Sequence, residues 1–99
     1  MFEINNRKIS TDYPPYIVAE LSANHNGDLD LAKKIIKMTK DHGADAVKIQ
    51  TYTADTMTID SDRDDFQITS GLWEGYKLYD LYKWAETPFE WHKELFNYA

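Results

Sequence analysis

The sequence predicts an α/β fold in which parallel strands alternate with helices. Residues 16–22 and 45–51 are apolar on both faces apart from isolated polar side chains, which is typical of strands buried in a parallel sheet. Between them, residues 29–42 place apolar side chains at helical spacing on one face and lysines on the other. Strand, helix and strand with short links form a βαβ unit, whose crossover is right-handed almost without exception.

A hairpin is expected to precede this unit. Phe2 and Ile4 alternate with polar residues, and the asparagine pair at 5–6 is suited to a tight turn. The proline pair at 14–15 then breaks the chain and favours an extended lead-in to the first parallel strand.

The predicted helices have recognisable ends. Asp28 is placed to cap the helix that follows it, and Gly43 to stop it. Residues 52–75 lack a clear period and are predicted to form a long functional loop, followed by a short helix over 78–85. Residues 87–90, Thr-Pro-Phe-Glu, have the form of a capping box that starts a last helix.

Two parallel strands with helices on one side leave a sheet face uncovered, so the chain is expected to be truncated.

Composition limits the classes of partner. Seventeen acidic and eleven basic residues give a net charge of −6, which disfavours nucleic acid and anionic membranes. There is no cysteine, so disulfides and thiolate metal sites are excluded. No apolar run approaches the length of a secretion signal or a membrane span, and a cytoplasmic location is expected by default.

Three polar side chains are the candidates for chemistry, because the active site of a parallel βα fold lies at the carboxyl ends of the strands. Glu20 lies on the first parallel strand, and Lys48 and Gln50 share a face of the second. Such charges need a partner or a ligand. One interpretation is a structural Glu20–Lys48 ion pair. The other is a substrate site, in which the lysine holds an anionic carboxylate or phosphate and the glutamate transfers protons.

Other candidate sites are weaker. His25 and His92 are too far apart in sequence for a local metal motif, so turn and helix roles are favoured. Trp73 lies in the long loop and could either pack in the core or contact a sugar.

The residues also resemble a known family. Residues 17–27, Ile-Val-Ala-Glu-Leu-Ser-Ala-Asn-His-Asn-Gly, and 43–51, Gly-Ala-Asp-Ala-Val-Lys-Ile-Gln-Thr, closely resemble the opening of sialic acid (N-acetylneuraminate) synthases. Residues 52–58, 78–82 and 87–92 resemble the branch of this family that makes pseudaminic acid. The resemblance spans nearly the whole chain.

The resemblance implies a fold and a reaction. The fold is a (β/α)8 TIM barrel, with 1–15 as an N-terminal hairpin and lead-in and 16–99 as a partial catalytic barrel, truncated after two βα units and a following helix. The reaction is condensation of phosphoenolpyruvate with a diacetamido-trideoxy hexose to give pseudaminic acid and phosphate. The resemblance further implies that a divalent metal, manganese or magnesium, assists the reaction and that the full-length enzyme is a homodimer. The family's metal-binding histidines fall beyond residue 99, so no residue is assigned to the metal, and the fragment alone is expected to be inactive.

The resemblance also assigns roles to residues. Glu20 would contact the sugar and act as the acid/base, Lys48 would bind phosphoenolpyruvate, and Gln50 would contact the sugar. Sialic acid synthases have a sugar-binding asparagine in the loop where this chain has Gly-Leu-Trp-Glu-Gly at 71–75, which indicates a different acetamido sugar and makes Trp73 a candidate contact.

Three alternatives stay open. The first is an N-acetylneuraminate synthase that uses N-acetylmannosamine. The second, against which the residues around the two strands argue, is a deoxy-octulosonate or deoxy-heptulosonate synthase on the same barrel. The third is a non-catalytic fragment stabilised by association with a partner chain, driven by burial of half-exposed strands.

Overall fold

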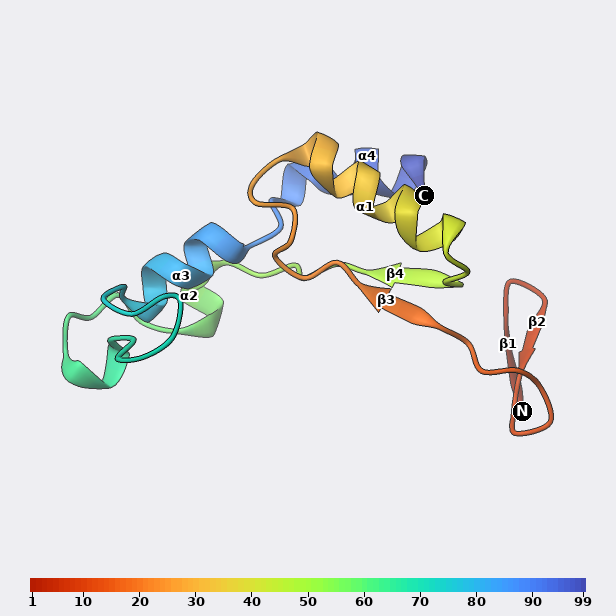
Figure 1. Cartoon of the computed structure of the whole chain (residues 1–99), viewed down its shortest axis with the longest axis horizontal. Coiled ribbons are helices and arrows are strands. Elements are labelled where there is room, and N and C mark those ends of the chain that lie inside the picture. Colours follow the sequence, from red (N-terminus) through yellow and green to blue (C-terminus); the bar gives the residue numbers. More distant parts are fainter.

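The computed structural model describes residues 1–99 and contains two separate two-stranded sheets. Figure 1 shows three parts along the long axis: a hairpin at one end, a parallel sheet with two helices in the middle, and two further helices at the other end. The elements in chain order are β1 (Phe2–Ile4), β2 (Arg7–Ile9), β3 (Val18–Glu20), α1 (Leu29–Asp41), β4 (Ala46–Lys48), α2 (Ala54–Met57), the 3₁₀ helix η1 (Asp64–Phe66), α3 (Leu78–Ala85), the 3₁₀ helix η2 (Phe89–Trp91) and α4 (His92–Tyr98).

The predicted hairpin is present. β1 and β2 pair in antiparallel register, and Asn5 and Asn6 both adopt left-handed backbone angles, with φ of 48° and 66°. A two-residue turn with both central residues left-handed matches the twist of the flanking strands, and asparagine tolerates that conformation better than most residues. Arg7 ties the hairpin to the parallel sheet, because its guanidinium pairs with Asp45 and donates to the Pro15 carbonyl at 3.0 Å.

The second sheet pairs β3 and β4 in parallel, as predicted, with Val18 opposite Ala46 and Glu20 opposite Lys48. Each strand has three residues, so the prediction of seven-residue strands was wrong in length. The backbone explains the early ends. Ser22 turns into the left-handed region with φ of 55°, and the Gln50 carbonyl accepts from the amide of Thr87, which belongs to no strand.

Helix α1 begins and ends where the sequence indicated. The Asp28 carboxylate accepts from the amides of Asp30 and Leu31, and so satisfies two of the free N–H groups of the first turn. The helix ends at Asp41, and Gly43 follows with φ of 92°, a conformation that strains any residue with a Cβ. Both predicted signals are confirmed.

The core lies between the parallel sheet and the helices α1 and α4, which cover one face of that sheet (Figure 1). Its buried members are Leu21, Ala32, Ile36 and Leu95, with Val47, Ile49 and Trp91 packed against them. The opposite face has no cover, and Val18 is 50% exposed there. The strands are therefore buried on one face only, whereas their sequence predicted burial on both.

Residues 52–85 form the end of the molecule beyond the carboxyl ends of β3 and β4 (Figure 1). The helix predicted over 78–85 is α3, but the segment predicted as an irregular loop also contains α2 and η1. α2 is only one turn long, too short for a helical period to show in the sequence. Lys77 links the start of α3 to this loop, because its ammonium lies 2.8 Å from Asp60 and 3.4 Å from Asp62. The hydrogen bond to Asp60 raises the pKa of Lys77.

The predicted capping box at 87–90 is wrong. Thr87 is buried, and its hydroxyl has no hydrogen-bond partner, so it caps nothing. Its amide donates to Gln50 instead, which holds Thr87 beside the end of β4. The chain then enters the 3₁₀ turn η2 before the α-helix α4 begins at His92, so the first regular turn starts later than the motif indicated.

None of the helices combines the length and the apolar composition that crossing a lipid bilayer requires.

Replacing Leu95 by alanine is expected to lower the free energy of unfolding by about 2–4 kcal/mol, because it leaves a cavity in a core with few members. Leu95 is 2% exposed and is the buried residue that α4 contributes. Met38→Ala is the matched control, since Met38 is 57% exposed. Urea denaturation of both variants measures the difference; an equal, small effect would show that α4 does not complete the core.

Candidate functional site

Glu20 and Lys48 lie side by side on the uncovered face of the parallel sheet. They are direct partners in the strand register, and the Lys48 ammonium donates to the Glu20 carboxylate at 3.4 Å. Each is the last residue of its strand, so both lie at the carboxyl ends of the sheet. The structure therefore brings these two side chains together.

The pair is open to solvent. The Glu20 side chain is 64% exposed and that of Lys48 56%. An ion pair with this exposure contributes about 1 kcal/mol or less to stability, because water screens the charges and two long side chains lose freedom. The pair alone is thus a weak reason for placing opposite charges here, and both groups are free to contact a ligand.

Gln50 extends the polar set past the end of β4. The Ser22 hydroxyl lies 3.5 Å from the Gln50 side-chain oxygen, and the Leu21 amide donates to the Lys48 carbonyl at 3.0 Å. The loop after β3 and the loop after β4 therefore meet at this edge. The sequence did not indicate Ser22 as a neighbour of Gln50, because its left-handed backbone cannot be inferred from strand alternation.

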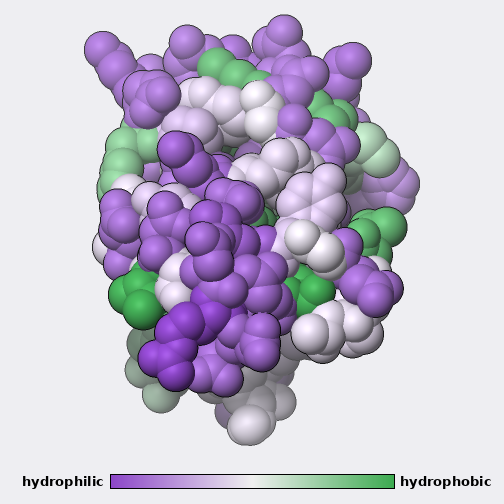
Figure 2. Space-filling model, turned by 90° about the vertical axis from the view of Figure 1, so that its left-hand side faces the viewer, coloured by the Kyte–Doolittle hydropathy of each residue, from purple (hydrophilic) through white to green (hydrophobic).

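Trp73 lies in the loop between η1 and α3, within an aromatic cluster. Its ring is 5.4 Å from that of Tyr76 and 4.8 Å from that of Trp84. Figure 2 views the molecule from the end that carries this segment and shows a largely hydrophilic surface with separate hydrophobic side chains. Leu72, at the tip of the loop, is 91% exposed. Packing is the role that the structure shows for Trp73, and its contact with a sugar stays a prediction.

The two histidines with predicted turn and helix roles are both held by neighbours. His92 begins α4, where its Nε2 lies 2.6 Å from the Thr51 hydroxyl and its Nδ1 3.0 Å from the Phe89 carbonyl. His25 lies in the loop after β3 and is 1% exposed, a burial that the sequence did not indicate. No three side chains of histidine, aspartate or glutamate gather in a way that could hold a metal ion. The residues of this chain do not fit the metal that the resemblance implies.

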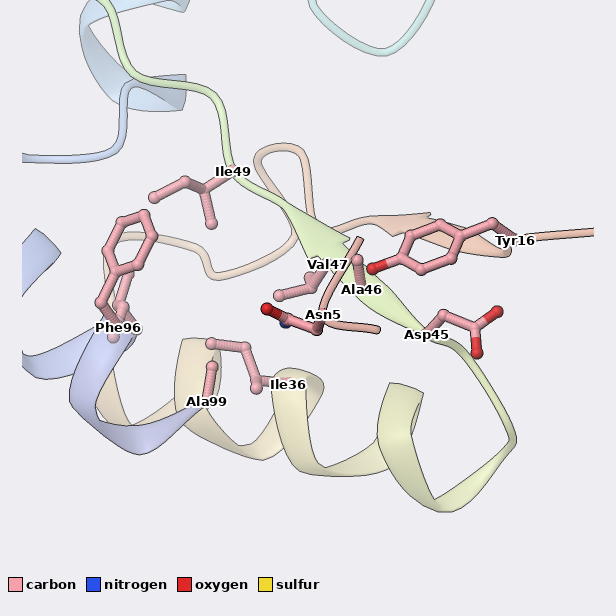
Figure 3. Close-up of a pocket in the computed structure, with 10 residues that line it drawn as sticks. Asn5, Tyr16, Ile36, Asp45, Ala46, Val47, Ile49, Phe96 and Ala99 are labelled. Atoms are coloured by element: carbon pink, nitrogen blue, oxygen red, sulfur yellow. The ribbon is translucent and has the colours of Figure 1, made fainter. Parts of the chain in front are cut away.

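An open groove lies on the opposite, helix-covered side of the sheet (Figure 3). Its volume is about 320 Å³, and Figure 3 shows Val47 of β4 and Ile49, which follows β4, directed toward Ile36 of α1 and Phe96 of α4. The lining is mostly apolar and includes none of Glu20, Lys48 and Gln50. It continues the hydrophobic core and is separate from the polar site.

The polar set can bind an anion next to a proton-transfer group. An ammonium such as that of Lys48 makes charge-assisted hydrogen bonds to a carboxylate or a phosphate, and a carboxylate such as that of Glu20 accepts a proton from a hydroxyl or returns one. The Gln50 amide can both donate to and accept from a sugar hydroxyl or acetamido group. The three side chains that carry these functions all lie at or just past the carboxyl ends of β3 and β4.

Comparison with known proteins shows the family of this chain. The model of the NeuB family matches residues 35–99. The chain is 56% identical, over 90 residues and 91% of its length, to the pseudaminic acid synthase of Campylobacter jejuni. This chain belongs to the NeuB family.

Further relatives in the family bear the names of sugar acid synthases. The chain is 57% identical over 86 residues, 87% of its length, to the pseudaminic acid synthase of Helicobacter pylori. It is 49% identical over 59 residues, 54% of its length, to the N,N'-diacetyllegionaminic acid synthase of Legionella pneumophila. These matches cover 26%, 25% and 17% of the Campylobacter, Helicobacter and Legionella proteins. The chain thus spans about a quarter of the length of the two pseudaminic acid synthases that it matches.

Proposed function

We propose that this chain is the amino-terminal part of a phosphoenolpyruvate-dependent nonulosonic acid synthase that makes pseudaminic acid. The observation that carries the proposal is the Glu20–Lys48 pair, exposed at the carboxyl ends of two parallel strands, in a chain 56% identical to a pseudaminic acid synthase. In this function the full-length protein condenses phosphoenolpyruvate with a 2,4-diacetamido-2,4,6-trideoxy hexose and releases phosphate.

The proposed roles follow the chemistry of the side chains. Lys48 holds the anionic end of phosphoenolpyruvate, Glu20 transfers a proton at a sugar oxygen, and Gln50 contacts the sugar. C3 of phosphoenolpyruvate forms the new bond to the aldehyde carbon of the open-chain sugar, the aldehyde oxygen takes up a proton, and water adds at C2 as phosphate leaves. A divalent metal bound by residues outside this chain would supply a Lewis acid for the aldehyde oxygen, and none of the residues of this chain would hold it.

The parent fold that we propose is a (β/α)8 barrel, with 1–15 as the hairpin and 16–99 as the first part of the catalytic domain. The supporting feature is the uncovered face of the β3–β4 sheet, where Val18 is half exposed and Glu20 and Lys48 are solvated. Closing the sheet into a barrel would turn this face into the interior and bring further loops to the same edge. We also propose that the full-length enzyme is a cytoplasmic homodimer and that residues 1–99 alone are inactive.

The test is phosphate release by the full-length protein with manganese, phosphoenolpyruvate and each of three acetamido sugars. The expected result is turnover with the 2,4-diacetamido-2,4,6-trideoxy sugar of the pseudaminic acid series. Turnover only with N-acetylmannosamine would assign an N-acetylneuraminate synthase, and turnover only with the legionaminic acid precursor would assign that relative's reaction. No turnover with any sugar, by a folded protein, would overturn the proposal.

A non-catalytic fragment is the second candidate, because only eight residues are buried and one sheet face is bare. A chain of this kind would associate to cover that face. Light scattering of residues 1–99 separates the two cases. Stable, stoichiometric association with unchanged secondary structure would favour a binding role for the fragment, whereas a monomer or a non-specific aggregate would not.

A further inference from the structure

His25 is the one ionisable side chain of this chain that is fully buried, at 1% exposure. Its Nδ1 accepts from the Gly27 amide at 2.9 Å, so the ring nitrogen that carries the proton in the neutral ring is Nε2. Nε2 is buried and has no hydrogen-bond partner. A buried donor without a partner is costly, and one that persists calls for a role beyond packing.

The loop that His25 occupies contains strained backbone. Ser22 and Asn26 have left-handed angles, with φ of 55° and 50°, in addition to Gly27 with φ of 72°. A non-glycine residue in this region costs about 1 kcal/mol or more, and it persists only where the surroundings hold it. His25 lies between these residues and is the only side chain of 22–27 that is buried. The hydrogen bond that its Nδ1 accepts from the Gly27 amide therefore stabilises the turn from the buried side.

His25 also contacts the segment that holds Gln50. Its ring stands edge-on to Trp91 of η2, with centroids 5.1 Å apart. Four residues earlier in that segment, the Thr87 amide donates to the Gln50 carbonyl at 3.2 Å. On the other side, the loop of His25 brings the Ser22 hydroxyl to the Gln50 side chain. His25 therefore belongs to the loop that reaches the Gln50 side chain, and through Trp91 it contacts the segment that bonds to the Gln50 backbone.

We propose that His25 is a positioning residue for the candidate site, which as an uncharged ring locks the loop 22–27 against Trp91 and so places Ser22 and Gln50 at the edge beside Glu20 and Lys48. It does not touch substrate. This inference rests on the proposed function for its kinetic consequence, but the state of the ring is a property of the folded protein with or without activity.

The surroundings favour the uncharged ring. Burial lowers the pKa of His25 below its ordinary value of 6.5, and neighbouring charges make no contribution. No carboxylate bonds to the ring, because Nδ1 accepts from the Gly27 amide and Nε2 has no hydrogen-bond partner. Of the nearby charged groups, Asp28 accepts from the first amides of α1, and Lys33 of α1 pairs with Glu94 of α4 at 2.8 Å. Glu90 of η2 is exposed to solvent.

The lowered pKa has a consequence for stability. The unfolded chain takes up a proton at about 6.5, while the folded protein resists it until a lower pH. Stability is therefore full above this value and declines as the pH falls through the window below it. We expect the melting temperature to drop between pH 7 and pH 5 by more in the wild type than in His25→Asn, which cannot titrate; equal drops would show that His25 does not contribute.

The decisive experiment compares His25→Asn with His25→Leu in the full-length protein. Asparagine keeps an oxygen that can accept from the Gly27 amide, whereas leucine fills the space without an acceptor. We expect His25→Leu to lower kcat/KM by about tenfold or more, chiefly through a higher KM for the sugar. The reason is that Gln50, the proposed sugar contact, would be displaced and would bind the sugar less well. His25→Asn should recover most of this loss. Wild-type kinetics in His25→Leu would overturn the proposal.

A spectroscopic measurement keeps the test independent of activity. Nitrogen NMR of the wild-type protein labelled at histidine, with the His25 signals assigned by their absence from His25→Asn, reports the tautomer at pH 7. The neutral form with the proton on Nε2 is expected. A ring that is charged, or protonated on Nδ1, would overturn the proposal. If the wild type shows the expected ring but turns over no sugar, the proposed function fails while the positioning of the loop stands.

Discussion

Glu20→Gln in the full-length protein is expected to lower kcat by about a hundredfold or more, the usual contribution of a general acid or base. Glutamine has nearly the shape of glutamate but cannot transfer a proton at neutral pH. The fold should survive, because the Glu20 side chain is 64% exposed and its ion pair with Lys48 contributes little to stability. Phosphate release under saturating substrates measures kcat, and circular dichroism checks the fold.

The matched control for this change is Glu90→Gln. Glu90 is also an exposed glutamate, but it lies in η2 and has no ion-pair partner. Its replacement removes the same charge without touching the sheet edge, so near-normal kcat is expected. If Glu20→Gln and Glu90→Gln behave alike, Glu20 has no part in proton transfer and the site as proposed is wrong.

Lys48→Met is expected to lower kcat/KM for phosphoenolpyruvate by about a hundredfold, because a charge-assisted hydrogen bond to an anion contributes about 1.5–3 kcal/mol. Methionine keeps most of the length of the aliphatic stem and removes the ammonium. The control is Lys34→Met, which removes an exposed lysine from α1 without an ion pair. Initial rates at varied phosphoenolpyruvate measure the effect, and a loss confined to the sugar KM would contradict the assigned role.

Exchanging the two charges separates a structural pair from a substrate site. The double variant with Glu20→Lys and Lys48→Glu keeps an ion pair between directly opposed residues of β3 and β4. If the pair only stabilises the sheet, the exchanged variant regains the activity that each single change loses. If the residues meet substrates, the anion-binding and proton-transfer groups stand in the wrong places and the activity stays low. We expect the second outcome.

The local elements of this fold could be predicted to a large extent from the sequence. The asparagine pair at 5–6, the Asp28 cap and the Gly43 stop act through backbone conformations and hydrogen bonds within a few residues of each other, and the structure has each of them. The capping box at 87–90 failed although its pattern was as clear. A more distant partner, the carbonyl of Gln50, holds the Thr87 amide and keeps the chain extended there.

The candidate site divides in the same way. Alternation along a strand predicts that Lys48 and Gln50 share a face, since side chains two residues apart do so. The register that sets Glu20 opposite Lys48 is seen only in the structure. Strand alternation could not predict the contact between Ser22 and Gln50 or the burial of His25, because both depend on left-handed backbone angles after β3.

The sequence by itself determined the order of the elements, the parallel pairing of two apolar strands and the polar residues at their ends, because these follow from periodicity and from interactions between near neighbours along the chain. Only the tertiary structure decided where the strands stop, which sheet face stays bare, and which histidine is buried beside the site. Those features depend on how α1, α4 and the loops after β3 and β4 pack against one another, and packing between distant segments leaves no periodic signal in the sequence.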